Sequence, residues 1–234
     1  MADTAKHLGI DIGGTNIACG IVNEECEIIA RSKVKTNSPR PYAEILADII
    51  KAAELACEEA GITPQELDSI GIGCPGTCNQ TTGAVEYSNN LGFVNAPLRT
   101  DIQAKFGVPT FLGNDADAAA YGEYCAGAAK SAGSAVVITL GTGVGSGIII
   151  DGKIYSGSNF AGGEIGHTVI EVDGRPCTCG RKGCFEAYSS ATGLVNTTRE
   201  FAEKYPQSLM ADLIKKDGKV SILIKKMTNR EMSL

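Results

Sequence analysis

One short segment constrains the fold of this chain more than any other, because it gathers residues that bind metal ions. One of the two histidines and three of the nine cysteines lie between residues 167 and 184, within the run GHTVIEVDGRPCTCGRKGCFE. One imidazole nitrogen and three thiolates complete the tetrahedral shell that a structural zinc ion prefers. Glycines in the run allow so short a loop to turn back on the ion. The sequence therefore predicts a zinc site formed by His167, Cys177, Cys179 and Cys184.

Other interpretations of these cysteines stay open at this point. Cysteines without a metal behave as small buried hydrophobes or pair as disulfides. A bridge between Cys177 and Cys179 would be strained, because the two lie so close in the sequence. A zinc loop can also be purely structural. Glu164 and Glu186 stand at its two ends, and we expect a rigid loop flanked by carboxylates to hold a ligand.

Composition limits the classes of protein that fit. A length of 234 residues, with 43% hydrophobic residues and 29 glycines, predicts a globular protein of one large domain or two lobes. The net charge of -6, without a basic cluster, offers no electrostatic footprint for nucleic acid. An anionic substrate would have to be bound by backbone dipoles or a cation.

The amino terminus and the hydropathy pattern predict a cytoplasmic protein. We expect no signal peptide, because residues 1–16 lack a basic segment followed by an apolar core. No apolar run approaches the length of a membrane span, so no membrane partner is expected. The remaining cysteines are then expected to be reduced core residues, namely Cys19, Cys26, Cys57, Cys74, Cys78 and Cys125.

The first half of the chain alternates strand and helix patterns. Three apolar runs, residues 7–13, 17–23 and 27–36, predict a meander of strands. Apolar side chains then recur at steps of three and four over residues 42–60, which predicts an amphipathic helix ended by Gly61. A capping box (Thr63, Pro64 and Glu66), a strand at 69–73, a helix at 95–106 and a strand at 109–112 follow.

The second half repeats part of this pattern. An alanine-rich helix over residues 117–129 leads to strands at 135–143 and 144–150, and Asp151 and Gly152 predict a hairpin turn. Strands around a glycine-rich turn therefore occur twice. This duplication predicts two related lobes, residues 1–115 and 116–234.

Both glycine-rich turns are candidate phosphate sites. Each joins two apolar strands, so its backbone amides lie exposed in a tight hairpin that a phosphate can approach. Neither is a nucleotide P-loop, and the second leads to a strand where a dinucleotide fingerprint needs a helix. Either turn alone would be interpreted as a simple hairpin, but the pair, with an acid ending the first strand, favours phosphate binding. The residues are Asp11, Gly13, Gly14, Thr15 and Asn16 in the first turn, and Gly141, Thr142 and Gly143 in the second.

These motifs together resemble the ROK family of bacterial sugar kinases, and among them the glucokinases. The resemblance is carried, over residues 7–200, by DIGGTN, GCPG, NDADAAA, LGTGVGSG, GGEIGH and CTCGRKGCFE. It implies an α/β, two-lobed fold of the actin-like and hexokinase-like ATPases, with ribonuclease H-like lobes. It also implies phosphorylation of the 6-hydroxyl of glucose, with ATP, Mg²⁺ and a structural Zn²⁺. Homodimers are common in the family.

The resemblance assigns roles to individual residues. Asp115 matches the general base that accepts the sugar hydroxyl proton; its simpler interpretation is a helix N-cap, and Asp117 is a first-turn acid. His167 would bind zinc through one ring nitrogen and sugar through the other. Glu164 and Glu186 could instead be solvated surface acids. The residues expected to bind sugar are Gly76, Asn90, Asn114, Asp115, Glu164, His167 and Glu186.

The resemblance places the nucleotide phosphates and Mg²⁺ at the two glycine turns. Asp11 matches the acid that organises Mg²⁺, often through water, and Mg²⁺ keeps enough waters for one nearby carboxylate to suffice. Thr15 and Thr142 would contact phosphate oxygens through their hydroxyls and backbone.

The carboxyl end departs from the family pattern. The chain stops before the glycine-rich turn expected to hold adenosine, and residues 221–234 match nothing expected there. We therefore expect an incomplete second lobe, which leaves catalytic competence open. The alternatives are a kinase for another hexose or an N-acetylated amino sugar, and a non-catalytic sugar-binding regulator. The first phosphate turn begins at Asp11, too early for a DNA-binding helix-turn-helix to precede it, so DNA binding is not expected.

Overall fold

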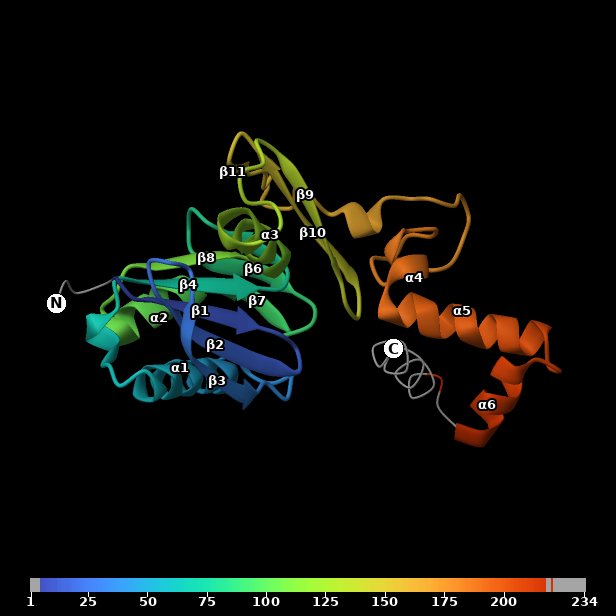
Figure 1. The fold of residues 1–234 in the computed structure, drawn as a ribbon, viewed down its shortest axis with the longest axis horizontal. Helices are drawn as coiled ribbons and strands as arrows, with labels where there is room; N and C mark the ends of the chain where they lie inside the picture. Colours follow the sequence, from blue (N-terminus) through green and yellow to red (C-terminus); the bar gives the residue numbers. More distant parts are fainter. Residues whose placement is uncertain (1–4, 218–219, 221–234) are drawn as a thin grey trace. The chain divides into compact units, whose positions relative to one another are not determined.

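The computed structural model describes residues 5–217 and 220 (Figure 1). Contacts divide the chain into two compact units. The first contains residues 1–137 and 146–163, and the second contains residues 138–145 and 164–234. The lobes predicted from the sequence, 1–115 and 116–234, have a different boundary and stay a prediction.

The first unit is built on a mixed five-stranded sheet. Its strand order is β3-β2-β1-β4-β8. The first three strands are antiparallel, whereas β1, β4 and β8 run parallel, as in a ribonuclease H-like lobe. Buried isoleucines on the inward positions of β1 and β2 make this sheet the centre of the hydrophobic core. The strands are β1 (His7–Ile12), β2 (Asn16–Val22), β3 (Ile28–Lys35), β4 (Ser69–Cys74) and β8 (Thr110–Asn114).

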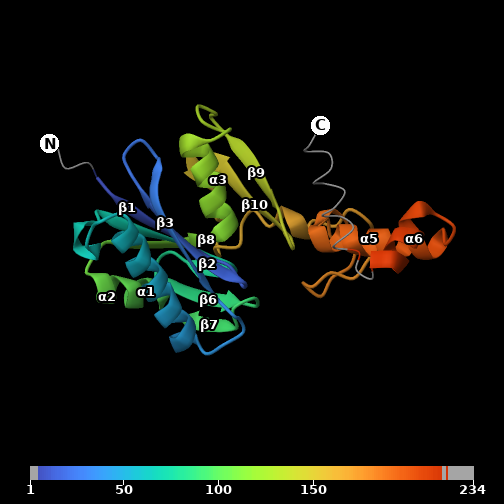
Figure 2. The ribbon, with the colours of Figure 1, turned by 60° about the horizontal axis from the view of Figure 1, so that its bottom comes forward.

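Helices lie on both faces of this sheet. Helix α1 (Tyr42–Glu59) packs against β2 and β3 through a buried stripe that includes Ile45, Ile49, Ala53 and Ala56. Helix α3 (Asp115–Ala126) contacts β4 and β8 on the opposite face (Figures 1 and 2). The parallel strands are thus covered on both sides, as such strands require.

The predicted helix boundaries are largely observed. Gly61 follows α1 with a φ of 68°, and the capping box at Thr63 and Glu66 is present at the short 3-10 helix η1 (Pro64–Glu66). Helix α2 (Leu98–Phe106) ends at Gly107, which is left-handed with a φ of 70°. The helix was expected over residues 95–106 with its start near Pro97; Pro97 is indeed its N-cap, whereas residues 95 and 96 belong to a strand.

That strand is part of a small sheet that the sequence pattern did not reveal. Its antiparallel order is β5-β6-β7, with β5 (Thr77–Asn79), β6 (Ala84–Ser88) and β7 (Phe93–Ala96). The side chain of Arg99 donates to the carbonyls of Gln80 and Thr81 at 2.7 and 3.2 Å and so closes the turn between β5 and β6.

A third sheet has the order β11-β10-β9, with β9 (Ala135–Leu140), β10 (Val144–Ile150) and β11 (Lys153–Ile154). Asp151 and Gly152 form the predicted hairpin turn with positive φ angles of 48° and 75°. The glycine-rich turn between β9 and β10 belongs to the second unit.

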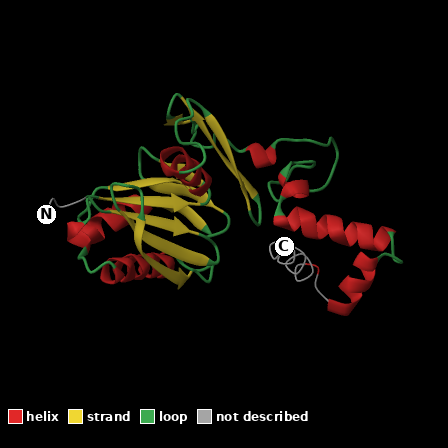
Figure 3. Cartoon of the chain, in the orientation of Figure 1, coloured by secondary structure: helices red, strands yellow, loops and turns green. Residues whose placement is uncertain are grey.

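Residues 164–217 are mostly loop and helix (Figure 3). The short 3-10 helix η2 (Ile165–His167) and the cysteine loop are followed by α4 (Glu186–Ser189), α5 (Ala191–Lys204) and α6 (Leu209–Asp217). Ser190 caps α5 by accepting a hydrogen bond from the N–H of Gly193 at 3.0 Å. The tail singled out above, 221–234, lies outside the described residues. None of the described helices combines the length and the apolar character needed to cross a bilayer.

Candidate functional site

The four predicted metal ligands lie together in the second unit. The ligand atoms of His167, Cys177, Cys179 and Cys184 all lie within 4.8 Å of one another. The Sγ atoms of Cys179 and Cys184 are 3.6 Å apart, and the Sγ of Cys177 is 3.6 Å from Nδ1 of His167. Tetrahedral zinc, with bonds of about 2.3 Å to sulfur and about 2.0 Å to nitrogen, separates such pairs by about 3.8 and 3.5 Å. The spacing and the soft donor set therefore fit zinc.

Loop contacts maintain the ligand geometry. Arg181 donates to the backbone oxygen of His167 at 3.0 Å. Burial raises the pKa of the Cys179 thiol, but hydrogen bonds from the backbone and side chain of Arg181 and from the other two cysteines outweigh it and lower that pKa to about 6. Cys179 is therefore favoured as a thiolate, the form that binds metal.

Arg175, which was not predicted from the sequence, anchors the metal loop (residues 167–184) to helices α4 and α5. Its guanidinium donates to Thr197 Oγ1 at 2.8 Å, pairs with Glu200 at 2.5 Å and lies 4.7 Å from the centre of the Tyr188 ring. The Tyr188 hydroxyl in turn accepts from the N–H of Arg175 at 2.8 Å. Arg175 lies two residues before the first cysteine ligand, but only the fold identifies its partners.

Glu186, predicted to bind sugar, lies at the start of α4. Its Oε2 accepts from the N–H of Val144 at 3.0 Å, and its Oε1 accepts from the hydroxyl of Thr178 at 3.3 Å. The side chain is half-buried and is therefore not a freely solvated surface acid. Glu164, at the other end of the metal segment, precedes η2 and is exposed.

In the first unit, Asp11 and Asp115 lie at the same edge of the main sheet. Because β1, β4 and β8 are parallel, their carboxyl ends meet there, and the register pairs Asp11 with Gly73 and Cys74 with Asn114. Burial raises the pKa of Asp115; the hydrogen bond from the Ala116 N–H opposes this, and the negative charge of Asp11 raises the pKa further. Desolvation also raises the pKa of Asp11.

The N-cap of α3 is Asn114 rather than Asp115. The Oδ1 of Asn114 accepts from the N–H groups of Ala116 and Asp117 at 2.9 and 3.2 Å. The simpler interpretation of Asp115 as the N-cap was therefore wrong, although its own Oδ1 also accepts from Ala116 at 3.0 Å. Asp117 is a first-turn acid, as expected.

Gly76 has a structural reason to be glycine. Its φ is 108°, and a Cβ there would collide with the backbone oxygen of Tyr87 and lie 2.9 Å from Cα of Ser88. Its backbone oxygen accepts from Nδ2 of Asn114 at 3.1 Å, which joins the GCPG loop to the start of α3. Two of the residues predicted to bind sugar are therefore in direct contact.

The first glycine turn is fixed by Thr36. Thr36 donates its hydroxyl to the oxygen of Gly13 at 2.6 Å and its N–H to the oxygen of Thr15 at 3.0 Å. A Cβ on Gly14 would lie 3.7 Å from the backbone oxygen of Asn90, so the predicted phosphate turn and Asn90 are neighbours. Thr36, fully buried beyond β3, was not identified from the sequence.

The predicted site residues thus form two groups, one in each unit. The first unit holds Asp11, Gly13, Gly14, Thr15, Asn16, Gly76, Asn90, Asn114 and Asp115. The second unit holds Gly141, Thr142, Gly143, Glu164, His167, Cys177, Cys179, Cys184 and Glu186.

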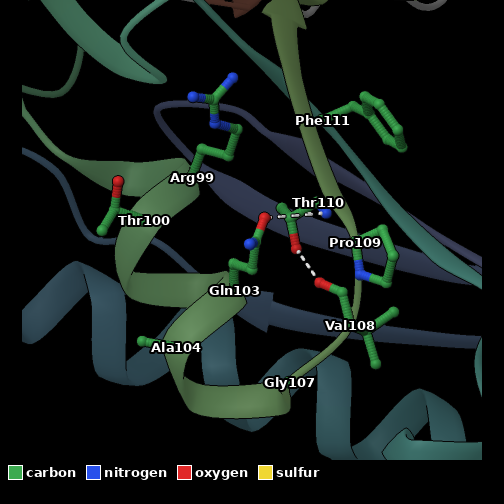
Figure 4. Close-up of a pocket in the computed structure, with 9 residues that line it drawn as sticks. All are labelled: Arg99, Thr100, Gln103, Ala104, Gly107, Val108, Pro109, Thr110 and Phe111. Atoms are coloured by element: carbon green, nitrogen blue, oxygen red, sulfur yellow. Dashed lines mark hydrogen bonds between the residues drawn. The ribbon is translucent and has the colours of Figure 1, made fainter.

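A separate pocket of about 690 Å³ lies between α2 and the start of β8 (Figure 4). Gln103 Oε1 accepts from the N–H of Thr110 at 3.4 Å on its wall. None of the predicted site residues lines this pocket.

Comparison with known proteins identifies the family. Residues 7–230 match the model of the ROK family, so the chain belongs to that family. The match extends beyond residue 200, where the motif resemblance ended, and includes much of the unfamiliar tail. The structural match to a ROK family glucokinase confirms the incomplete actin-like fold expected from the motifs.

Individual relatives include both enzymes and regulators. The glucokinase of Streptomyces coelicolor is 36% identical over 212 residues, 90% of this chain and 64% of the relative. A crystal structure of a ROK family glucokinase from Streptomyces griseus, in complex with glucose and AMPPNP, has a TM-score of 0.78 at 36% identity and covers 92% of this chain and 67% of that one. A xylose repressor of Caldicellulosiruptor bescii is 31% identical over 202 residues, 86% of this chain and 51% of the repressor. The chain thus spans less than two thirds of the length of the Streptomyces coelicolor glucokinase.

Proposed function

We propose that this protein is a hexose kinase that transfers the γ-phosphoryl group of ATP to the 6-hydroxyl of glucose. The observation that carries the proposal is the pair of carboxylates at one sheet edge, Asp115 beside Asp11, in a chain 36% identical to a glucokinase. Both acids have raised pKa values, which is typical of functional sites. This suits a site where Asp115 orients a hydroxyl and Asp11 binds a cation.

In the proposed mechanism, Asp115 orients the sugar hydroxyl and accepts its proton late in the transfer, as a weak base does in a loose transition state. The raised pKa of Asp115 lies closer to neutral pH than that of an ordinary aspartate, which makes its carboxylate a better proton acceptor. Asn114 fixes Asp115 at the start of α3 through its cap hydrogen bonds. The amides of the two glycine turns are proposed to bind the phosphates, and Asp11 to hold Mg²⁺ through water.

Sugar recognition is proposed to use both groups of residues. Carboxylates, amides and an imidazole give the directional donors and acceptors that a polyol needs, and a site built this way rejects a sugar that lacks one hydroxyl. The residues are Gly76, Asn90, Asn114, Asp115, Glu164, His167 and Glu186. A zinc ion on His167 and the three cysteines would fix the ring orientation and tautomer of His167.

A coupled assay for glucose 6-phosphate, with Mg²⁺ and ATP and a panel of hexoses and N-acetylated amino sugars, tests the proposal. Turnover with glucose that exceeds the turnover with the other sugars is the expected result. A preference for another sugar would keep the kinase and replace the substrate, and no turnover with any sugar would contradict the kinase function.

The similarity to a xylose repressor favours a second candidate function, that of a sugar-binding regulator. Calorimetry with xylose and glucose, together with a gel-shift assay on DNA, distinguishes the two. A regulator would bind sugar without turnover, whereas the proposed kinase gives turnover and no sequence-specific shift.

A further inference from the structure

Within the second unit, one side chain joins the metal loop to the second glycine turn. Glu186 lies two residues beyond the last cysteine ligand, Cys184. Its Oε2 accepts a hydrogen bond from the N–H of Val144 at 3.0 Å, directly after the turn at residues 141–143. That turn was predicted from the sequence to bind phosphate and Glu186 to bind sugar, with no connection between the two.

The Glu186 carboxylate lies close enough to the turn to determine which residue can stand there. A Cβ at Gly143 would collide with Oε2 of Glu186 and approach its Cδ to 3.2 Å. Gly143 does not have a left-handed φ, so its backbone does not require glycine. At Gly141, in the same turn, an added Cβ would meet no atom within 4 Å. A side chain at position 143 would therefore have to displace the carboxylate of Glu186.

The turn is also tied to the beginning of α5. The N–H of Ala191 donates to the oxygen of Gly141 at 2.9 Å, and the hydroxyl of Thr192 donates to the oxygen of Thr142 at 2.9 Å. Together with the bond from Val144 to Glu186, three hydrogen bonds join residues 141–144 to residues 186–192. The turn and the segment after the metal loop therefore form one connected element.

The second carboxylate oxygen faces the metal loop. Oε1 of Glu186 accepts from the hydroxyl of Thr178 at 3.3 Å and lies 3.8 Å from Sγ of the metal ligand Cys177. One half-buried carboxylate thus bridges the metal loop and the glycine turn. A shift of this carboxylate changes a contact on both sides, because Oε2 bonds to the N–H of Val144 and Oε1 to the hydroxyl of Thr178.

We infer that Glu186 is a positioning residue for the second phosphate turn and that it couples hexose binding to nucleotide binding. The inference rests on the proposed function, in which Glu186 accepts a sugar hydroxyl. A hydroxyl bound to this carboxylate fixes its position and with it the N–H of Val144. Because coupling between two sites is reciprocal, nucleotide on the turn then raises the affinity for hexose by the same factor.

The test compares Gly143→Ala with Gly133→Ala in the full chain; Gly133 lies outside the proposed site, and an added Cβ there meets no atom within 4 Å. Because the protein has no tryptophan, glucose binding is measured by calorimetry, first without nucleotide and then with Mg²⁺ and AMPPNP. We expect the nucleotide to tighten glucose binding to the wild-type chain about fivefold or more, the lower end of ordinary coupling. Gly143→Ala should weaken nucleotide-free glucose binding by a similar factor, because its Cβ displaces the Glu186 carboxylate, whereas Gly133→Ala should not.

Hydrogen exchange at Val144 is a second readout that does not depend on a sugar. Its amide should exchange faster in Gly143→Ala than in Gly133→Ala, and circular dichroism checks that both variants are folded. Equal glucose affinity and equal exchange in the two variants would overturn the inference and leave the kinase proposal intact. A wild-type chain that binds no hexose would overturn both.

Discussion

At the scale of single residues, Asp115 illustrates the energetic cost of burying a carboxylate near a second acid. Its pKa is raised in the folded chain, so folding favours the protonated form. The unfolded chain releases this proton at lower pH, and the free energy of unfolding therefore falls as the pH rises from the unfolded pKa through the folded pKa. At neutral pH the charged Asp115 destabilises the fold, partly through Asp11.

Replacing Asp115 by asparagine should therefore stabilise the protein at neutral pH. We expect the melting temperature of Asp115→Asn to exceed that of the wild type at pH 7, and the difference to shrink as the pH falls below the folded pKa of Asp115. Thermal unfolding at a series of pH values measures this. A variant less stable than the wild type at pH 7 would contradict the raised pKa.

Gly76 carries a second prediction at this scale. Alanine there would be strained by the φ of 108° and would collide with Tyr87, so Gly76→Ala should lower the free energy of unfolding by about 1–3 kcal/mol. Gly113→Ala is the matched control, because an added Cβ there meets nothing within 4 Å. Urea unfolding of both variants measures the difference, and equal stabilities would show that the GCPG loop adapts.

At the scale of elements, the sequence predicts what is local. The strands at residues 7–13, 17–23 and 27–36, helix α1 and the Gly107 cap follow from short-range patterns and are observed. The sheet of β5, β6 and β7 was not predicted, because its strands are short and it is held by distant contacts such as Arg99 on Gln80. The grouping of the four metal ligands was predicted, whereas the Arg175 contacts behind them were not, because they depend on packing against α5.

The metal loop gives the prediction at this scale. Purified protein should contain about one zinc ion per chain, and Cys184→Ser should lose most of it, because one of four ligands is removed. Cys125→Ser is the control, since Cys125 lies in α3 outside the cluster. Elemental analysis of the three proteins decides the matter. Equal zinc in both variants, or none in the wild type, would contradict the site.

At the scale of the whole molecule, the chain combines two units of which each supplies part of the proposed machinery. The first unit brings Asp11 and Asp115 to one sheet edge, which follows from parallel pairing and was foreseen only as a family resemblance. The second unit couples the metal loop to a glycine turn through Glu186, which no local pattern indicates. The family could be predicted from motifs, while the connections within each unit required the fold.

The most direct test of the central claim is phosphorus NMR of a reaction mixture that contains the full chain, Mg²⁺, ATP and glucose. We predict that the wild type forms glucose 6-phosphate and that Asp115→Asn, still folded, forms it about 10²- to 10⁴-fold more slowly, because the proton acceptor is lost. Absence of glucose 6-phosphate from the wild-type reaction, or its formation at the same rate by Asp115→Asn, would contradict the account.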